Sequence, residues 1–201
     1  MTVLCLSRQP IVDRDNTIIG YELLYRDNHD TQGSPEGCPQ SLANGLFAAL
    51  SHIGEDQVAG QFPPFINLSE ELLLLPEVVA LLPDNAVIEV VKESDFSPQL
   101  FERVVELKDA GFCISLDAFE PTPQNEHFIP LADIIQLDVA NMTPEKVRML
   151  VKQLSRKELS LMAEQVEDVD AYSFCRALPF DYFQGFYCGK PELFGRKRTL
   201  H

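Results

Sequence analysis

Short apolar runs alternate with longer amphipathic segments along most of this chain. Six runs of five or six mostly apolar residues have the length of buried strands, at 63–68, 86–91, 112–117, 134–138, 159–164 and 180–184. Around them, helices are predicted at 41–51, 69–82 with a proline interruption, and 97–108. A further helix is predicted to begin at Thr143, and the one after the strand at 159–164 is predicted to end at about Ala177. Regular alternation of strand and helix is typical of an α/β fold built on a parallel sheet.

The chain opens on two further strand-like runs, at 3–12 and 16–25. The polar turn Asp13-Arg14-Asp15 between them is short enough to force antiparallel pairing. With this hairpin the pattern predicts eight strands in all, and the later ones are expected to close a parallel barrel. At 201 residues, the chain is predicted to form a single domain over 1–201.

Seven of the predicted strands end in a carboxylate or amide side chain. The pattern centres on Ile114 to Glu120, where a buried strand runs into Asp117 and then into a proline-containing loop. The C-terminal ends of barrel strands meet on one face, so these side chains should collect there as oxygen ligands for a divalent metal. The series consists of Glu22, Asn67, Glu89, Asp117, Asp138, Glu164 and Gln184.

Charge narrows the classes of ligand. The chain carries 31 acids against 16 bases, a net charge of −15, and the resulting negative field repels duplex DNA and RNA. Nucleic-acid binding is therefore not expected, and Arg196-Lys197-Arg198 is interpreted as a solvated tail or the start of a linker. A small phosphate ligand remains compatible where a divalent metal or a few arginines reverse the local sign.

The cysteines and the length of the apolar runs indicate in which cellular compartment the protein lies. The five cysteines are odd in number and include no CxxC pair, which suits a reducing environment. The N-terminus lacks the build of a secretion signal, and no apolar run approaches the roughly 20 residues of a membrane-spanning helix. We therefore predict a cytoplasmic protein without a membrane span.

The ordered motifs resemble the EAL domain, the bacterial phosphodiesterase of cyclic di-GMP, over nearly the whole chain. The family's Gln-Pro-Ile corresponds to 9–11, its Glu-Ala-Leu-x-Arg to 22–26 and its Asn-Leu-Ser to 67–69. Its Ala-Glu-x-Val-Glu corresponds to 163–167 and its Gln-Gly-Phe to 184–186, with Glu89 and Asp117 at the family's strand-end glutamate and first loop aspartate. Seven motifs in the family's order make a specific signal.

The resemblance implies a modified (β/α)8, TIM-like barrel whose first strand runs antiparallel. It also implies phosphodiester hydrolysis with two Mg²⁺ or Mn²⁺ ions, in which Glu164 would be the base. The metal ligands that it implies are Glu22, Asn67, Glu89, Asp117 and Asp138, and the ligand-binding residues are Gln9, Arg26, Glu167 and Gln184.

Three departures from the family bear on catalysis. Ala118 stands where active members carry a second aspartate, so the second metal loses an oxygen ligand. Gln136 replaces the family's lysine and carries no charge to stabilise a developing oxyanion. Lys92 stands where a glutamate steadies the aspartate loop, with Glu93 one place late. We therefore expect at most one bound Mg²⁺ or Mn²⁺, and very low or no turnover.

Three functions stay open on the sequence. The first is a catalytically degenerate EAL domain that binds cyclic di-GMP or docks a signalling protein. The second is an active phosphodiesterase that converts cyclic di-GMP to linear pGpG, and the third is an unrelated barrel enzyme acting on another phosphate ester or a sugar. The degenerate motifs also resemble the EAL half of EAL-HDOD signalling proteins, so the chain is expected to be either a whole domain or part of a longer protein with a C-terminal HDOD-like domain.

Overall fold

The structure is a computed structural model and describes residues 4–27, 60–91, 97–155 and 158–194. The helix predicted at 41–51, the departures at Lys92 and Glu93, and the basic segment 196–198 lie outside the described residues. Among the helices of the described ranges, none is long and apolar enough to cross a bilayer.

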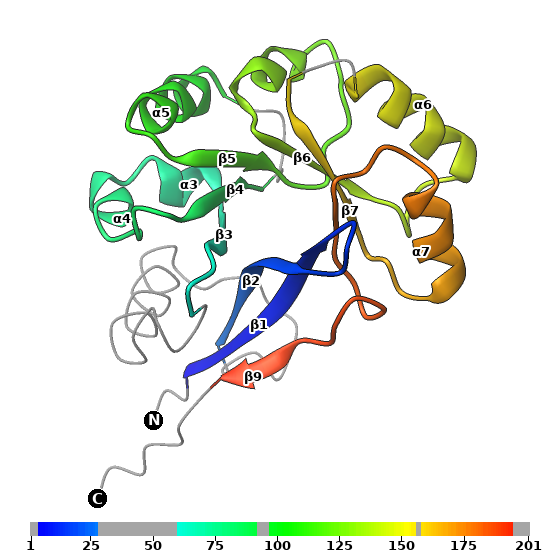
Figure 1. The fold of residues 1–201 in the computed structure, drawn as a ribbon. Coiled ribbons are helices and arrows are strands. Elements are labelled where there is room, and N and C mark those ends of the chain that lie inside the picture. The colour runs from blue at the N-terminus through cyan, green and yellow to red at the C-terminus, as the bar shows by residue number, and fades with distance from the viewer. Residues whose placement is uncertain (1–3, 28–59, 92–96, 156–157, 195–201) are drawn as a thin grey trace, which may run out of the picture.

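Within these ranges the strands form one sheet that closes on itself (Figure 1). β1 (Leu4–Asp13) pairs antiparallel with β2 (Ile18–Asp27) along one edge and with β8 (Tyr182–Phe183) along the other. This pairing confirms the predicted barrel with an antiparallel first strand. The parallel strands from β2 to β8 are β3 (Pro64–Leu68), β4 (Val87–Val90), β5 (Cys113–Leu116), β6 (Ile134–Asp138) and β7 (Ser160–Glu164).

One strand is not among those predicted. β9 (Glu192–Phe194) pairs antiparallel with Leu6 to Arg8 of β1. Arg8 also forms an ion pair with Glu192 at 3.3 Å. Three residues are too few to show the two-residue period of a strand, so only the pairing with β1 identifies this one.

The helices lie on the outer side of the barrel (Figure 1). They are α3 (Glu70–Leu73), α4 (Pro76–Val79), α5 (Pro98–Asp109), α6 (Pro144–Leu154) and α7 (Val169–Arg176). Pro76 begins α4, so the interruption predicted within 69–82 is confirmed. Ser97, Thr143 and Asp168 cap α5, α6 and α7 by accepting hydrogen bonds from backbone N–H groups of the first turn. A 3₁₀ helix, η1 (Glu126–Leu131), occupies part of the predicted loop after β5.

Side chains alternate between the two faces of each strand and so form two separate apolar layers. Residues such as Ile88 and Leu116 pack against helix residues such as Leu100 in the main core, between the strands and the helices. Strand residues of the opposite parity face the inside of the barrel. There, a second buried cluster, hereafter the apolar floor, consists of Ile11, Phe65, Val87, Ile134 and Met162. Side chains two residues further along these strands face the same interior.

Candidate functional site

Polar side chains form the next layer of the barrel interior beyond the apolar floor. Strand pairing brings Asn67, Glu89 and Ser115 into one register across β3, β4 and β5. Gln136 and Glu164 follow the floor residues of β6 and β7 by two positions. Glu89, Ser115 and Gln136 are each at most 1% exposed. These polar groups must therefore find their partners within the barrel.

Glu22 is held by two amides. Its Oε1 accepts a hydrogen bond from Asn67 Nδ2 at 2.5 Å, and its Oε2 accepts one from Gln184 Nε2. These three residues come from β2, the end of β3 and the end of β8. The structure thus brings together three strand-end residues that the sequence places up to 162 positions apart.

A second group surrounds Glu89. Gln136 Nε2 donates hydrogen bonds to Glu89 Oε1 and, at 2.7 Å, to Ser115 Oγ. The other carboxylate oxygen, Glu89 Oε2, is buried and has no hydrogen-bond partner among the described residues. The neutral amide of Gln136 therefore occupies the place beside Glu89 where the family resemblance puts a lysine ammonium.

Four carboxyl groups of this layer have raised pKa values. Burial is the main cause for Glu22, Glu89, Asp117 and Glu164. The charge of Glu22 raises the pKa of Glu89 further, and the charge of Asp117 does the same to Glu164. Among the described residues, none of the four is paired with a lysine or arginine. The barrel mouth thus concentrates acids that repel one another.

The chemistry of this layer fits a hard divalent cation. Its donors are carboxylate and amide oxygens, which Mg²⁺ and Mn²⁺ prefer, and a cation would satisfy the unpaired oxygen of Glu89. Within the described ranges, no three Asp, Glu, His or Cys side chains are gathered closely enough to form a ready-made metal site. The amides of Asn67, Gln184 and Gln136 contact the carboxylates of Glu22 and Glu89.

The remaining predicted residues lie around this layer. Asp138 Oδ2 accepts from Asn141 Nδ2 at 2.7 Å, and the Asp138 charge raises the pKa of Asp117, so Asp138 lies at the rim near Asp117. Gln9 is buried and donates to the Gly189 carbonyl at 3.0 Å. Glu167 is exposed. The side chain of Arg26 lies outside the described residues.

Ser115 belongs to the site and is missing from the sequence prediction. It is fully buried, and its hydroxyl contacts the same amide as Glu89. The signal that identifies it is parity, because Ser115 lies two residues before Asp117 on the inward face of β5. A serine within an apolar strand carries no charge, which is why the sequence alone does not single it out.

Ala118 follows Asp117 in an unusual backbone conformation. Its φ is +42°, in the left-handed region, and its methyl group supplies no ligand oxygen. Asp117 N donates to the Val90 carbonyl at 3.2 Å, and Phe119 N donates to the Gln136 carbonyl at 2.9 Å. The backbone on each side of Ala118 is therefore tied to neighbouring strands.

Stability is expected to fall as pH rises, because of the buried acids. The folded-state pKa values of Glu89 and Glu164 lie well above 4.5, so the folded chain binds more protons than the unfolded chain above that pH. Their stabilising contribution is fully present below 4.5 and is lost as pH rises through the folded pKa values. Urea unfolding from acidic to mildly basic pH, with a chelator present, measures this slope.

The substitution Glu89→Gln isolates the effect of one buried acid. The amide that it introduces keeps an acceptor for Gln136 and removes the repelled charge, so the variant is expected to flatten the slope and raise the free energy of unfolding at pH 8 by about 1 kcal/mol or more. Glu77→Gln, at an exposed position of α4, removes the same charge outside the site and is the control. An equal change of slope in both variants would contradict a specific role of the buried cluster.

The family is shown by comparison with known proteins. The model of the EAL domain matches residues 3–191. This chain belongs to the EAL domain family. The EAL domain protein from Listeria monocytogenes EGD-e superposes with a TM-score of 0.73 at 22% identity, over 94% of this chain and 88% of that one. The manganese/cy-diGMP complex of Klebsiella pneumoniae BlrP1 gives a TM-score of 0.73 at 21% identity, over 96% of this chain and 56% of that one.

Two curated relatives are longer than this EAL chain. Cyclic di-GMP phosphodiesterase CdgJ of Vibrio cholerae is 30% identical over 194 residues, which cover 94% of this chain and 44% of CdgJ. Uncharacterized protein YuxH of Bacillus subtilis is 27% identical over 193 residues, 94% of this chain and 47% of YuxH. The EAL chain thus spans somewhat less than half the length of either relative.

Proposed function

We propose that this EAL domain is a catalytically degenerate module of cyclic di-GMP signalling in the bacterial cytoplasm, which binds the dinucleotide or docks a signalling protein. The relative CdgJ carries the name of a cyclic di-GMP phosphodiesterase, which supports the pathway. The degenerate character is supported by the residues of the site itself.

The observation that carries the proposal is the pair of hydrogen bonds from Gln136 to Glu89 and Ser115. Cleavage of a phosphodiester requires stabilisation of negative charge that develops on oxygen. A neutral amide already committed to two acceptors supplies no such charge. Ala118 has only a methyl group beside Asp117 and cannot ligate a metal. The site therefore also lacks an oxygen ligand for a second metal ion, whose positive charge would assist cleavage.

One Mg²⁺ or Mn²⁺ would be held by Glu22, Asn67, Glu89, Asp117 and Asp138, all of which offer oxygen ligands. When bound, such an ion supplies positive charge for a phosphate group. Gln9, Arg26, Glu167 and Gln184 are the proposed contacts to the dinucleotide. Gln184 donates a side-chain hydrogen bond to Glu22, and Gln9 lies opposite Glu22 in the pairing of β1 with β2.

Glu164 favours a second candidate function, an active phosphodiesterase that produces linear pGpG. Burial and the charges of Asp117, Glu89 and Glu22 raise the pKa of Glu164 well above 4.5. A carboxylate with a pKa displaced toward neutrality is suited to general base catalysis. Glu164 would then accept a proton from the attacking water, and the absence of a charged group at Gln136 would limit the rate.

Calorimetry with cyclic di-GMP, with and without Mn²⁺, is the test of the proposal. We expect heat of binding and no linear pGpG by chromatography after long incubation at high protein concentration. Glu22→Ala should weaken binding about tenfold or more, because it frees the amides of Asn67 and Gln184 and deletes a proposed cation ligand. Glu71→Ala, exposed on α3, is the control and should bind like the wild type.

Other outcomes separate the candidates. Product that disappears in Glu22→Ala would establish the phosphodiesterase instead. The absence of heat with cyclic di-GMP under either condition would exclude dinucleotide binding and leave protein docking as the surviving part of the proposal.

A further inference from the structure

The loop that follows Asp117 is closed on itself by one buried amide. In this segment, hereafter the β5 loop (residues 118–125), Asn125 is only 3% exposed. Its Nδ2 donates to the Glu120 carbonyl at 2.9 Å, and its Oδ1 accepts from Thr122 N at 2.7 Å. The backbone N–H of Asn125 donates to the Thr122 carbonyl at 3.1 Å. Asn125 thus ties the C-terminal end of the loop to its middle.

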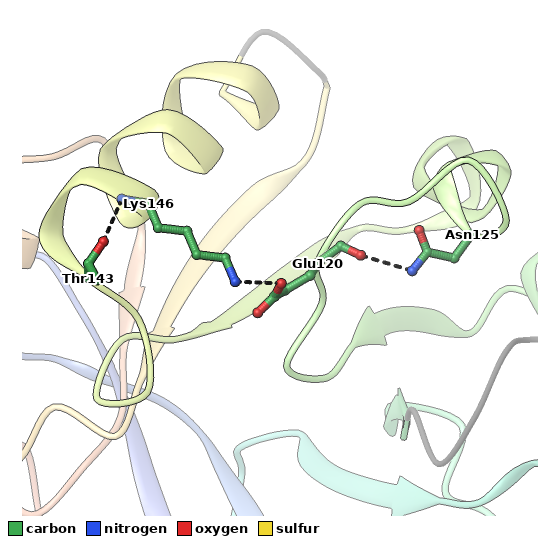
Figure 2. Close-up of polar contacts among 4 residues, drawn as sticks. All are labelled: Glu120, Asn125, Thr143 and Lys146. Carbon is green, nitrogen blue, oxygen red and sulfur yellow. Dashed lines mark hydrogen bonds and ion pairs between the residues drawn. The ribbon is translucent and has the colours of Figure 1, made fainter.

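An ion pair ties the same loop to helix α6. Lys146 Nζ lies 2.6 Å from Glu120 Oε2, and Lys146 N donates to Thr143 Oγ1, the N-cap of α6, at 3.3 Å. Figure 2 shows Glu120 held from both sides, by Asn125 through its carbonyl and by Lys146 through its carboxylate. Glu120 therefore attaches the loop to α6, in addition to the hydrogen bond from Phe119 N to the Gln136 carbonyl of β6.

The N-terminal end of the β5 loop directly follows Asp117 of the candidate site. Ala118 adopts a left-handed φ of +42°, which is unfavourable for alanine, and the next residue, Phe119, is fully buried. Contacts elsewhere must compensate for such a conformation. The attachment at Glu120 lies two residues beyond Ala118 and three beyond Asp117, so it is close in sequence to both.

We propose that Glu120 and Lys146 are positioning residues that hold the β5 loop closed and thereby orient the carboxylate of Asp117 toward the acidic layer. The ion pair joins the β5 loop and α6, and the interior of this loop is already closed by Asn125. The orientation of Asp117 as a cation ligand rests on the proposed function. The closure of the loop does not.

Hydrogen exchange measured by mass spectrometry tests the closure. In Glu120→Gln and Lys146→Met, the peptide that covers 117–126 is expected to exchange about two- to fivefold faster, the range of a partly exposed ion pair. The exchanged pair Glu120→Lys with Lys146→Glu should restore the wild-type rate. Glu145→Gln and Lys152→Met, exposed on the same helix, are matched controls and should leave this peptide unchanged. Unchanged exchange in both single variants would overturn the proposal.

Titration with Mn²⁺ separates positioning from simple charge. A charge effect alone would weaken Mn²⁺ binding in Glu120→Gln and strengthen it in Lys146→Met, because the two variants lose opposite charges. Loss of positioning should weaken binding in both, about two- to fivefold, with recovery in the exchanged pair. Opposite signs would overturn the role of the pair in orienting Asp117. A wild-type chain that binds no Mn²⁺ would remove the cation from the proposed function, and hydrogen exchange would still decide the closure.

Discussion

The substitution pair Ala118→Asp with Gln136→Lys is expected to raise the hydrolysis of cyclic di-GMP to linear pGpG by about 10²-fold or more over the wild-type chain. The pair restores the two charges that the family resemblance assigns to active members. Removing a single electrostatic contact of this kind commonly costs about 10²- to 10³-fold in rate. Chromatography of the product, under Mn²⁺ saturation, gives the rate of each variant.

The local structure at both positions bears on the new side chains. Aspartate tolerates the left-handed conformation at position 118 better than most residues, so Ala118→Asp adds a carboxylate without moving the loop. A lysine at position 136 would direct its ammonium toward the carboxylate of Glu89, which now accepts a hydrogen bond from the amide of Gln136. The ammonium would also compensate the charge of a buried acid that repels its neighbours.

Uncharged replacements provide the control. Ala118→Asn with Gln136→Met fills similar space without adding charge, and it should stay at the wild-type level. Adding Glu22→Ala to the charged pair should remove the gained activity, since it deletes a proposed cation ligand. A measurable wild-type rate equal to that of the charged pair would show that the two departures do not limit turnover, and the proposed degeneracy would then be wrong.

Gly185→Ala is expected to lower the free energy of unfolding by about 3 kcal/mol or more, or to prevent folding. A Cβ at this position would lie 2.2 Å from the Val166 carbonyl oxygen and 2.3 Å from Val166 N, and φ is +150°. Val166 N also donates to the Gln184 carbonyl at 2.9 Å, so relief of the overlap would separate the ends of β7 and β8. Gln184 would then lose its hold on Glu22.

Gly111→Ala is the matched control for this substitution. Gly111 also has a positive φ, +95°, but a Cβ there would meet none of the described residues within 4 Å. Its cost is therefore backbone strain alone, about 1 kcal/mol. Urea unfolding of both variants measures the difference. Equal losses in the two would show that strain, and not the contact with Val166, determines the requirement for glycine at position 185.

Much of the barrel is predictable because its signals are local. Strand length, the positions of Pro76, Pro98 and Pro144, and the short polar turn of the hairpin all act within a few residues of their own position. The weakly periodic parts were not predictable. β9 exists only through its pairing with β1, and η1 forms within a segment that contains Pro130.

The candidate site divides in the same way. The strand-end positions of Glu22, Asn67, Glu89 and Gln184 are predictable, because parallel strands place their C-terminal ends on one face. Two other contacts near the site are not predictable. Ser115 carries no charge that would single it out, and nothing in the sequence indicates that Glu120 pairs with Lys146. Glu167 fits the family motif but lies exposed, outside the described hydrogen-bonded layer.

The sequence by itself determined the closed α/β barrel and which of its strands end in an acid or amide side chain, since periodicity and strand spacing depend on near neighbours along the chain. Only the tertiary structure decided how those side chains share their hydrogen bonds. In the part of the chain that the structure describes, two amides contact Glu22, one contacts Glu89, and one oxygen of Glu89 has no partner. The physical reason is that burial raises the energy of an unpaired charge. The strength and sign of each interaction therefore depend on distances between strands, which no single segment of the sequence contains.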